Sequence, residues 1–327
     1  MKQLTQAKEQ MNHLGAEKIP FLFIIDFLME KPMVIPLNEV NSQQILFQTP
    51  IATNVTSDGL HQPIYIDSSL QRAPLSFEEY LHQFNAVVAE IKKGNSFVVN
   101  LTAQTPIQLV SNLKTVFYQA KSKYKLWYDD SFVCFSPETF VTIEQEKIKT
   151  FPMKGTINAS IPNARQLILN DIKETAEHNT VVDLLRNDLS MVAENVKVTR
   201  LRYVEEIETH KGKLLQVSSE IEGKLPSDYA FHLGDILFSM LPAGSVTGAP
   251  KKKTVDIIVH TESYQRGYYT GVFGVFDGHN LDSAVMIRFI EKTSHGYVYK
   301  SGGGITSKSQ ALNEYQELID KIYVPIY

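Results

Sequence analysis

Apolar residues recur at helical spacing in three long segments of the chain. The first runs from Phe77 to Lys93 and stops at Gly94. The second begins after Asp171, a residue type that commonly caps helix N-termini, and runs to about Leu189. The third covers residues 311–323. We expect three amphipathic helices, each packing its apolar stripe against a core.

Short apolar runs around these helices predict strands. We expect a buried strand within residues 19–29, one continuous strand over 140–150 and another over 283–290. Further strands are predicted at 97–101, 131–135, 197–204, 214–221, 268–276 and 297–300, with shorter helices at 231–241 and 251–260. Strands and helices mingle without regular βαβ alternation. The pattern therefore predicts an α+β fold in a single domain, residues 1–327, with helices outside an antiparallel core.

The composition argues against several classes of protein. The 327-residue chain has a formal net charge of -4 and scattered lysines and arginines, so we expect no binding of nucleic acid or an anionic membrane. The apolar run 19–29 is too short to span a membrane and contains Asp26. The one cysteine, Cys134, lies in a run typical of a buried strand and allows no disulfide framework within the chain. Because residues 1–15 lack an apolar signal core, we expect a cytoplasmic protein.

Two pairs of glutamates are candidates for a metal site. Glu174 and Glu177 lie on the helical face that becomes apolar further along, so both should turn towards the core. Inward carboxylates need a partner, and Mg²⁺, which takes oxygen ligands, is one. The pattern equally allows this pair to stabilise its helix N-terminus. Glu314, Glu317 and Lys321 share one side of the last helix, where a solvated Glu–Lys pair is the simpler interpretation.

Two Gly-rich segments could bind a small anion through backbone amides. Residues 242–250 open a helix, and residues 301–306 follow a strand. Neither matches a phosphate-binding P-loop or a dinucleotide fingerprint, and each alone is usually a tight turn. With Arg288 at the end of a strand, they suit a small carboxylate ligand. Lys154, between Pro152 and Gly155, is either a surface residue or, if buried near a cation, a nucleophile of lowered pKa.

The order of several motifs resembles the chorismate-utilising enzymes. The resemblance extends from about Phe77 to the C-terminus. It is carried by Ser136-Pro137-Glu138, Pro152-Met153-Lys154-Gly155-Thr156, Ala176-Glu177-His178, residues 182–189, Gly244-Ser245-Val246-Thr247-Gly248-Ala249-Pro250-Lys251, residues 266–271, Gly302-Gly303-Gly304-Ile305 and Glu314-Tyr315-Gln316-Glu317. It implies the fold of that family, in which two antiparallel sheets pack together and helices flank them. Residues 1–75 would be a reduced N-terminal strand region, in which we do not expect tryptophan control.

The resemblance also implies roles for individual residues. Glu177 and Glu317 would bind Mg²⁺, with Glu174 and Glu314 beside them, and the metal would hold the ring carboxylate of chorismate. Glu138 would be the general acid that protonates the departing C4 hydroxyl. The groups that bind or surround the substrate would be Tyr269, Arg288, Lys321, Gly302, Gly303, Gly304, Ser245 and Thr247.

Lys154 distinguishes the branches of the family. A lysine here is similar to the aminodeoxychorismate synthase component I branch, in which it attacks C2 of the ring before ammonia displaces it. Val98 stands where the water-adding branches carry a lysine base, which argues against isochorismate or salicylate formation. The chain has no Cys/His glutaminase arrangement, so ammonia would come from a partner glutamine amidotransferase. The product, 4-amino-4-deoxychorismate, would serve 4-aminobenzoate and folate synthesis.

Two alternatives remain. Anthranilate synthase component I shares most of the motifs but typically has alanine where this chain has Lys154. A non-catalytic relative that binds chorismate or an amidotransferase as a regulatory subunit is kept open by departures from the family pattern at Val98, Gln216 and Ala243.

Overall fold

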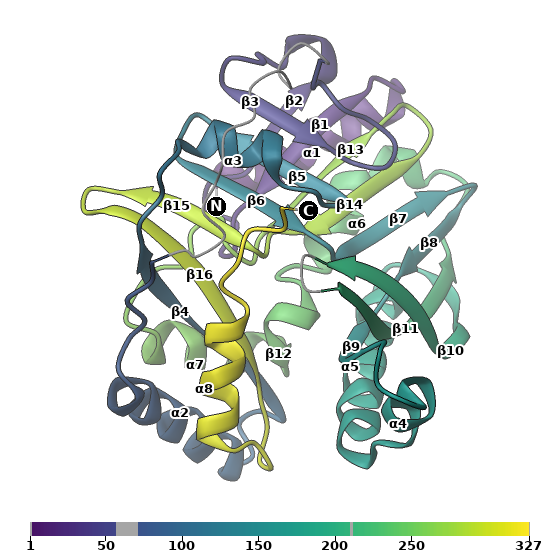
Figure 1. The fold of residues 1–327 in the computed structure, drawn as a ribbon. Coiled ribbons are helices and arrows are strands. Elements are labelled where there is room, and N and C mark those ends of the chain that lie inside the picture. The colour runs from purple at the N-terminus through teal and green to yellow at the C-terminus, as the bar shows by residue number, and fades with distance from the viewer. Residues whose placement is uncertain (1, 57–70, 210–211, 327) are drawn as a thin grey trace.

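Two antiparallel sheets packed on one another form the body of the protein (Figure 1). The computed structural model describes residues 2–56, 71–209 and 212–326. Residues 57–70, part of the N-terminal strand region expected over residues 1–75, lie outside the described residues. Helices cover the outer faces of both sheets. The α+β class with two packed antiparallel sheets is therefore confirmed.

The first sheet has nine strands within the described residues, and all neighbours pair antiparallel. Strand β9 (Met153–Asn158) lies off the main path and pairs with β11. The strands in their paired order are β10 (Glu194–Thr209), β11 (Gly212–Lys224), β8 (Lys147–Thr150), β7 (Thr139–Glu144), β14 (Leu281–Val285), β13 (Val272–Phe276), β1 (Phe21–Ile25) and β2 (Met33–Pro36).

The second sheet has seven strands, again paired antiparallel. In paired order they are β12 (Gly248–Ala249), β4 (Val98–Ile107), β16 (Gly296–Ile305), β15 (Phe289–Thr293), β6 (Phe132–Ser136), β5 (Tyr124–Tyr128) and β3 (Ile45–Gln48). Its longest pairing joins β4 to β16, the strand that carries the triple glycine.

The described helices divide between the two outer faces. The set consists of α1 (Lys2–Ala16), η1 (Leu37–Glu39), α2 (Phe77–Lys92), α3 (Leu113–Gln119), α4 (Ala164–Asn170), α5 (Ile172–Ser190), η3 (Tyr229–His232), α6 (Leu233–Ser239), η4 (Gly244–Val246), α7 (Lys251–Thr261) and α8 (Ala311–Asp320). Helices α1, α5 and α6 share a core with the first sheet, and α2, α7 and α8 share one with the second. None of these helices is long and apolar enough to cross a membrane.

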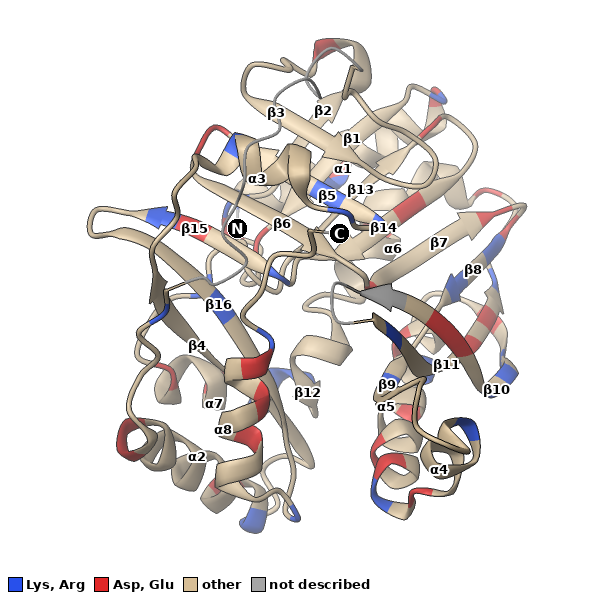
Figure 2. Cartoon of the chain, viewed as in Figure 1, with Lys and Arg blue, Asp and Glu red and all other residues tan. Residues whose placement is uncertain are grey.

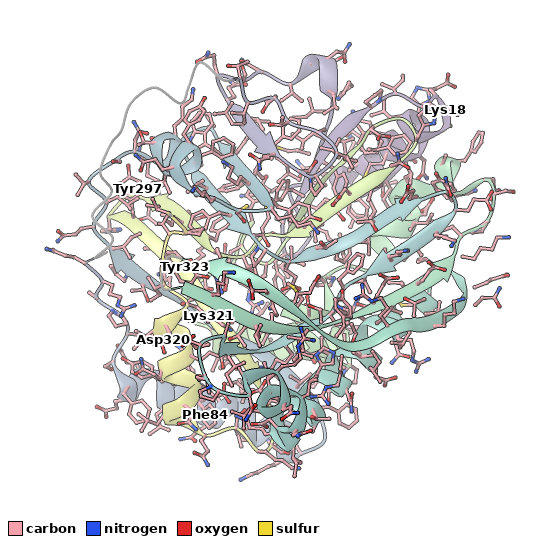
Figure 3. All side chains as sticks on the ribbon, turned by 45° about the vertical axis from the view of Figure 1, so that its right-hand side comes forward. Lys18, Phe84, Tyr297, Asp320, Lys321 and Tyr323 are labelled. Atoms are coloured by element: carbon pink, nitrogen blue, oxygen red, sulfur yellow. The ribbon has the colours of Figure 1, made fainter. Side chains whose placement is uncertain are left out.

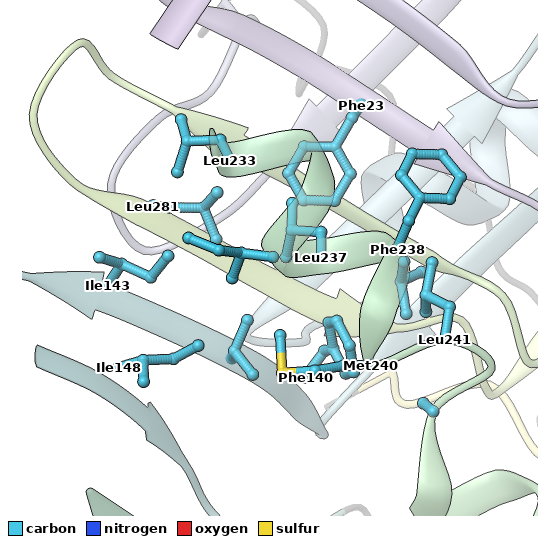
Figure 4. Close-up of a cluster of buried hydrophobic side chains, with 14 of the residues drawn as sticks. Phe23, Phe140, Ile143, Ile148, Leu233, Leu237, Phe238, Met240, Leu241 and Leu281 are labelled. Carbon is cyan, nitrogen blue, oxygen red and sulfur yellow. The ribbon is translucent and has the colours of Figure 1, made fainter. Parts of the chain in front are cut away.

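Side chains that alternate along each strand explain how both faces of the sheets are buried. In β6, Phe132 and Cys134 enter the core between the sheets, while Val133 and Phe135 pack with α3 on the outer side. Burial raises the pKa of the Cys134 thiol, as expected for a structural cysteine. On the outer face of the first sheet, Leu237 of α6 packs among side chains of β1, β7 and β14 (Figure 4).

Two predicted strands proved wrong in the same way, because an apolar pattern continued through a change of direction. Residues 140–150 form the hairpin β7–β8, whose turn at Gln145 and Glu146 has positive φ at both residues but lacks the usual Asn or Gly. The run 283–290 is divided between β14 in the first sheet and β15 in the second, with Arg288 at φ 52° between them. Helix α1 was also missed, since its sequence is largely polar and only one edge of it packs on α6.

Candidate functional site

One cavity gathers all but two of the candidate residues. It lies between β4, β16 and α8 on one side and β9 and α5 on the other, and the loop around η4 closes it. Acidic residues gather along α8 and around the α4–α5 turn, on the two sides of this cavity (Figure 2). The candidates that line it are Glu138, Lys154, Glu177, Ser245, Thr247, Tyr269, Arg288, Gly302, Gly303, Gly304, Glu317 and Lys321.

Glu138 and Arg288 lie side by side because the chain crosses between the sheets twice at one place. Glu138 stands in the short link from β6 to β7, and Arg288 in the link from β14 to β15. Each link accepts a backbone hydrogen bond from the strand that leads into the other link. The Val285 N–H donates to the Glu138 carbonyl (3.1 Å), and the Phe135 N–H donates to the Arg288 carbonyl (3.2 Å). Backbone pairing thus brings together a carboxyl and a guanidinium 150 residues apart in the sequence (288 minus 138).

The Glu138 carboxyl is poised for proton donation. Burial raises its pKa, although the Ser245 hydroxyl, Lys321 and Arg288 oppose the effect. The Ser245 hydroxyl donates to Glu138 Oε1 at 2.5 Å. A carboxyl of raised pKa that faces a cavity is better suited to donate a proton than an ordinary carboxylate is.

Lys154 enters the cavity from β9 and forms an ion pair with α5. Its Nζ lies 2.9 Å from Glu177 Oε2, and the two side chains are 25% and 16% exposed. Burial alone would lower the pKa of Lys154, but Glu317, Glu177 and Glu174 together raise it above its ordinary value. Among the protein groups alone, the three carboxylates outweigh the desolvation, and the lowered pKa expected of Lys154 beside a cation stays a prediction.

The Gly-rich strand and the last helix form the opposite wall. Lys321, at the end of α8 (Figure 3), donates to Glu317 Oε1 (2.6 Å) and to the Gly302 carbonyl (2.8 Å). A Cβ at Gly303 would lie 3.1 Å from Glu317 Oε1, so the missing side chain is what lets this carboxylate approach the strand. The i, i+4 pair expected from the sequence is present, but it faces the cavity.

Glu174 and Glu314 lie beside the cavity and do not line it. The cap of α5 is Asp171, whose side chain accepts the Glu174 N–H at 2.9 Å, so the glutamates are not needed as caps. Glu174 Oε2 is buried and accepts no hydrogen bond from the part of the chain described. Burial raises the pKa of Glu174 and of Glu314. Both carboxylates are buried at least in part, and a nearby cation would stabilise their charged form.

The donor set fits Mg²⁺. Glu177 and Glu317 face one cavity and offer only oxygen ligands, and the buried Glu174 Oε2 has no hydrogen-bond partner among the described residues. Within residues 2–56, 71–209 and 212–326, no three His, Cys, Asp or Glu side chains could hold a metal by themselves. Mg²⁺ usually binds one or two carboxylates and completes its shell with substrate and water, which two glutamates would allow.

Sequence reasoning missed three buried or mostly buried residues that lie behind the cavity lining. Asp188 of α5 and Lys251 of α7 form a mostly buried ion pair behind the loop that carries Ser245. Asp188 interrupts the apolar stripe of its helix, which was an available signal, whereas Lys251 was hidden in a run of three lysines. His178 is buried against Ser219 (2.7 Å between Nε2 and Oγ), beneath the strand that carries Lys154.

Comparison with known proteins identifies what the chain is similar to. A family model described as chorismate binding enzyme matches residues 39–326. A Haemophilus influenzae protein named only as an uncharacterized PabA-like protein is 49% identical over 318 residues, which cover 97% of this chain and 96% of that protein. Aminodeoxychorismate synthase component 1 of Klebsiella aerogenes is 32% identical over 78% of this chain and 58% of its own length.

A solved structure shows the same fold. Anthranilate synthase component I from Streptococcus pneumoniae superposes with a TM-score of 0.68 and 28% identity, covering 81% of this chain and 62% of that one. The cavity described above therefore belongs to a fold that is shared by enzymes of different product specificity.

Proposed function

We propose that this chain, which belongs to the family of chorismate binding enzymes, is an aminodeoxychorismate synthase component I that makes 4-amino-4-deoxychorismate from chorismate and ammonia. The observation that carries the proposal is Lys154, an amine that enters the same cavity as the acid Glu138. The 32% identity to a protein of that name supports it.

In the proposed reaction, Lys154 and Glu138 act in one displacement. The Lys154 amine attacks C2 of the ring, the two conjugated ring double bonds shift from C1=C2 and C5=C6 to C1=C6 and C4=C5, and the C4 hydroxyl takes the proton of Glu138 and leaves as water. Ammonia then attacks C4, both double bonds shift back to C1=C2 and C5=C6, and the bond from C2 to the Lys154 nitrogen breaks, which releases the lysine amine. Arg288 and Lys321 supply positive charge for the substrate carboxylates. Bound by Glu177 and Glu317, Mg²⁺ would add charge at the ring carboxylate.

Lys154 can attack only as the neutral amine, so its ion pair with Glu177 must open first. The carboxylates around Lys154 raise its pKa and so favour the ammonium form. Glu177 is one of the two glutamates proposed to bind the metal, and a carboxylate that binds a cation no longer holds the ammonium. Metal binding and release of the nucleophile would thus depend on the same side chain.

We propose that ammonia comes from a separate glutamine amidotransferase. A glutaminase of the cysteine type needs an accessible thiolate. Cys134, the one cysteine of the sequence, is fully buried in β6, and its pKa is raised by that burial. The chain should therefore use ammonium salts at raised pH, and should use glutamine only when the partner is added.

Product analysis tests the proposal. Purified protein would be incubated with chorismate, Mg²⁺ and ammonium, with and without an aminodeoxychorismate lyase. We expect 4-aminobenzoate only when the lyase is present. 2-Aminobenzoate would instead identify an anthranilate synthase, and the absence of turnover would support a non-catalytic relative.

A further inference from the structure

We propose that the ion pair between Asp188 and Lys251 is a positioning device that holds the Ser245 hydroxyl against Glu138. The inference rests on the proposed function in so far as Glu138 is the proton donor. Neither residue of the pair lines the cavity, so both would act through the loop between α6 and α7.

Lys251 ties together both ends of this loop. Its Nζ lies 2.7 Å from Asp188 Oδ1 and also donates to the Met240 carbonyl at 2.5 Å. Met240 immediately follows α6, and Lys251 is the first residue of α7. One ammonium group thus joins the start of the loop, its end and helix α5.

Asp188 contacts the middle of the same loop. A Cβ at Gly244 would lie 2.7 Å from Asp188 Oδ2, and Leu184 of the same helix face would also obstruct it. Gly244 therefore packs directly on α5 through its backbone. The next residue is Ser245, whose hydroxyl donates to Glu138 Oε1. The chain of contacts runs from Lys251 through Asp188 and Gly244 to Ser245 and Glu138.

The burial of the pair favours a positional role over a general stabilising one. The side chains of Asp188 and Lys251 are 8% and 20% exposed, so both charges lose most of their hydration. Such pairs are poor sources of net stability, and apolar residues of similar size often serve as well. What charged hydrogen bonds add is direction, and here they fix a loop whose hydroxyl must reach one carboxylate oxygen. Helix α5 also carries Glu177, so the pair ties the loop of Ser245 to the helix that carries this carboxylate.

A double-mutant cycle separates positioning from packing. Lys251→Met should lower kcat for chorismate consumption on the order of 10²-fold, with little change in KM, because a misplaced proton donor affects the chemical step. Lys251→Arg should recover much of the loss, and Lys252→Met, an exposed neighbour on the same helix, should behave like wild type. In a Ser245→Ala background, Lys251→Met should cost far less than it does alone.

The proposal would be overturned if the losses in kcat caused by Lys251→Met and Ser245→Ala were fully additive in the double variant. It would also be overturned if Lys251→Met lowered kcat/KM only by raising KM. A second measurement keeps it separate from the proposed function. Backbone amides 244–248 should exchange hydrogen faster in Lys251→Met than in Lys252→Met at equal global stability. A protein that consumes no chorismate would sink the proposed function alone, whereas unchanged exchange in this loop would sink the positioning role itself.

Discussion

Removing the Lys154 ammonium should make the protein bind Mg²⁺ more tightly even as it abolishes the nucleophile. In the structure, Lys154 Nζ holds Glu177 Oε2 at 2.9 Å, and both side chains are more than two-thirds buried. A metal that binds Glu177 must displace this charge-assisted hydrogen bond, which is worth about 1.5–3 kcal/mol. Lys154→Ala removes that competitor. We therefore expect the Mg²⁺ dissociation constant to fall by about 10- to 100-fold.

The matched control is the other lysine on the same carboxylate. Lys173 Nζ lies 3.6 Å from Glu177 Oε1, and its side chain is 53% exposed. An exposed pair of this kind contributes about 0.2–1 kcal/mol, so Lys173→Ala should tighten Mg²⁺ binding by about fivefold at most. Isothermal titration of each variant with MgCl₂, without chorismate, measures both constants independently of activity.

The comparison between the two variants decides the matter. If Lys154→Ala binds Mg²⁺ no more tightly than Lys173→Ala, the ammonium does not compete for the metal site, and the assignment of Glu177 as a ligand fails with it. Loss of all Mg²⁺ binding in Lys154→Ala, with the fold intact, would contradict the reasoning even more directly.

The same geometry gives four further predictions. Lys154→Ala should strongly reduce the formation of 4-amino-4-deoxychorismate and should yield some 2-amino product. The wild-type protein, incubated with chorismate without ammonia, should show a mass adduct on the peptide that contains Lys154. Full synthesis of 4-amino-4-deoxychorismate by the variant would exclude the covalent role. Glu177→Gln should weaken Mg²⁺-dependent turnover by at least about 10²-fold, since it removes one of two charged ligands, and an unchanged Mg²⁺ titration of activity would argue against it. Ser245→Ala removes a hydrogen bond that lowers the pKa of Glu138, so this pKa should rise further. The pH above which kcat falls should therefore move to a higher value. A move to a lower pH would contradict the role of protonated Glu138 as the proton donor. Leu237→Ala, at a fully buried position of α6, should reduce the free energy of unfolding in urea by about 2–5 kcal/mol, whereas the exposed Leu312→Ala should change it by less than about 0.5 kcal/mol.

The sequence by itself determined the elements whose pattern is local. The helix α5 begins after the Asp171 cap as expected, and α2 and α8 match their predicted apolar stripes within a few residues. Capping and periodicity depend on neighbours within one turn, so they can be read without the fold. The order of motifs likewise indicated the family, because each short motif keeps its residue types and its place in the chain.

Changes of direction could not be read from the same pattern. The run 283–290 stays apolar while it passes from one sheet to the other, since both environments are buried. Residues 140–150 keep their alternation through the β7–β8 turn for a similar reason. Periodicity reports whether a side chain is buried, and it does not report which partner buries it.

Only the tertiary structure decided the electrostatics of the site. Glu138, Lys154, Glu177 and Glu317 come from four separate segments, and one sheet crossing, a strand and two helices bring them to one cavity. Among the protein groups, burial lowers the pKa of Lys154, and Glu317, Glu177 and Glu174 raise it above its ordinary value because the fold brings these carboxylates close to it. A charge interaction varies with distance and burial, and the sequence specifies neither until the chain has folded.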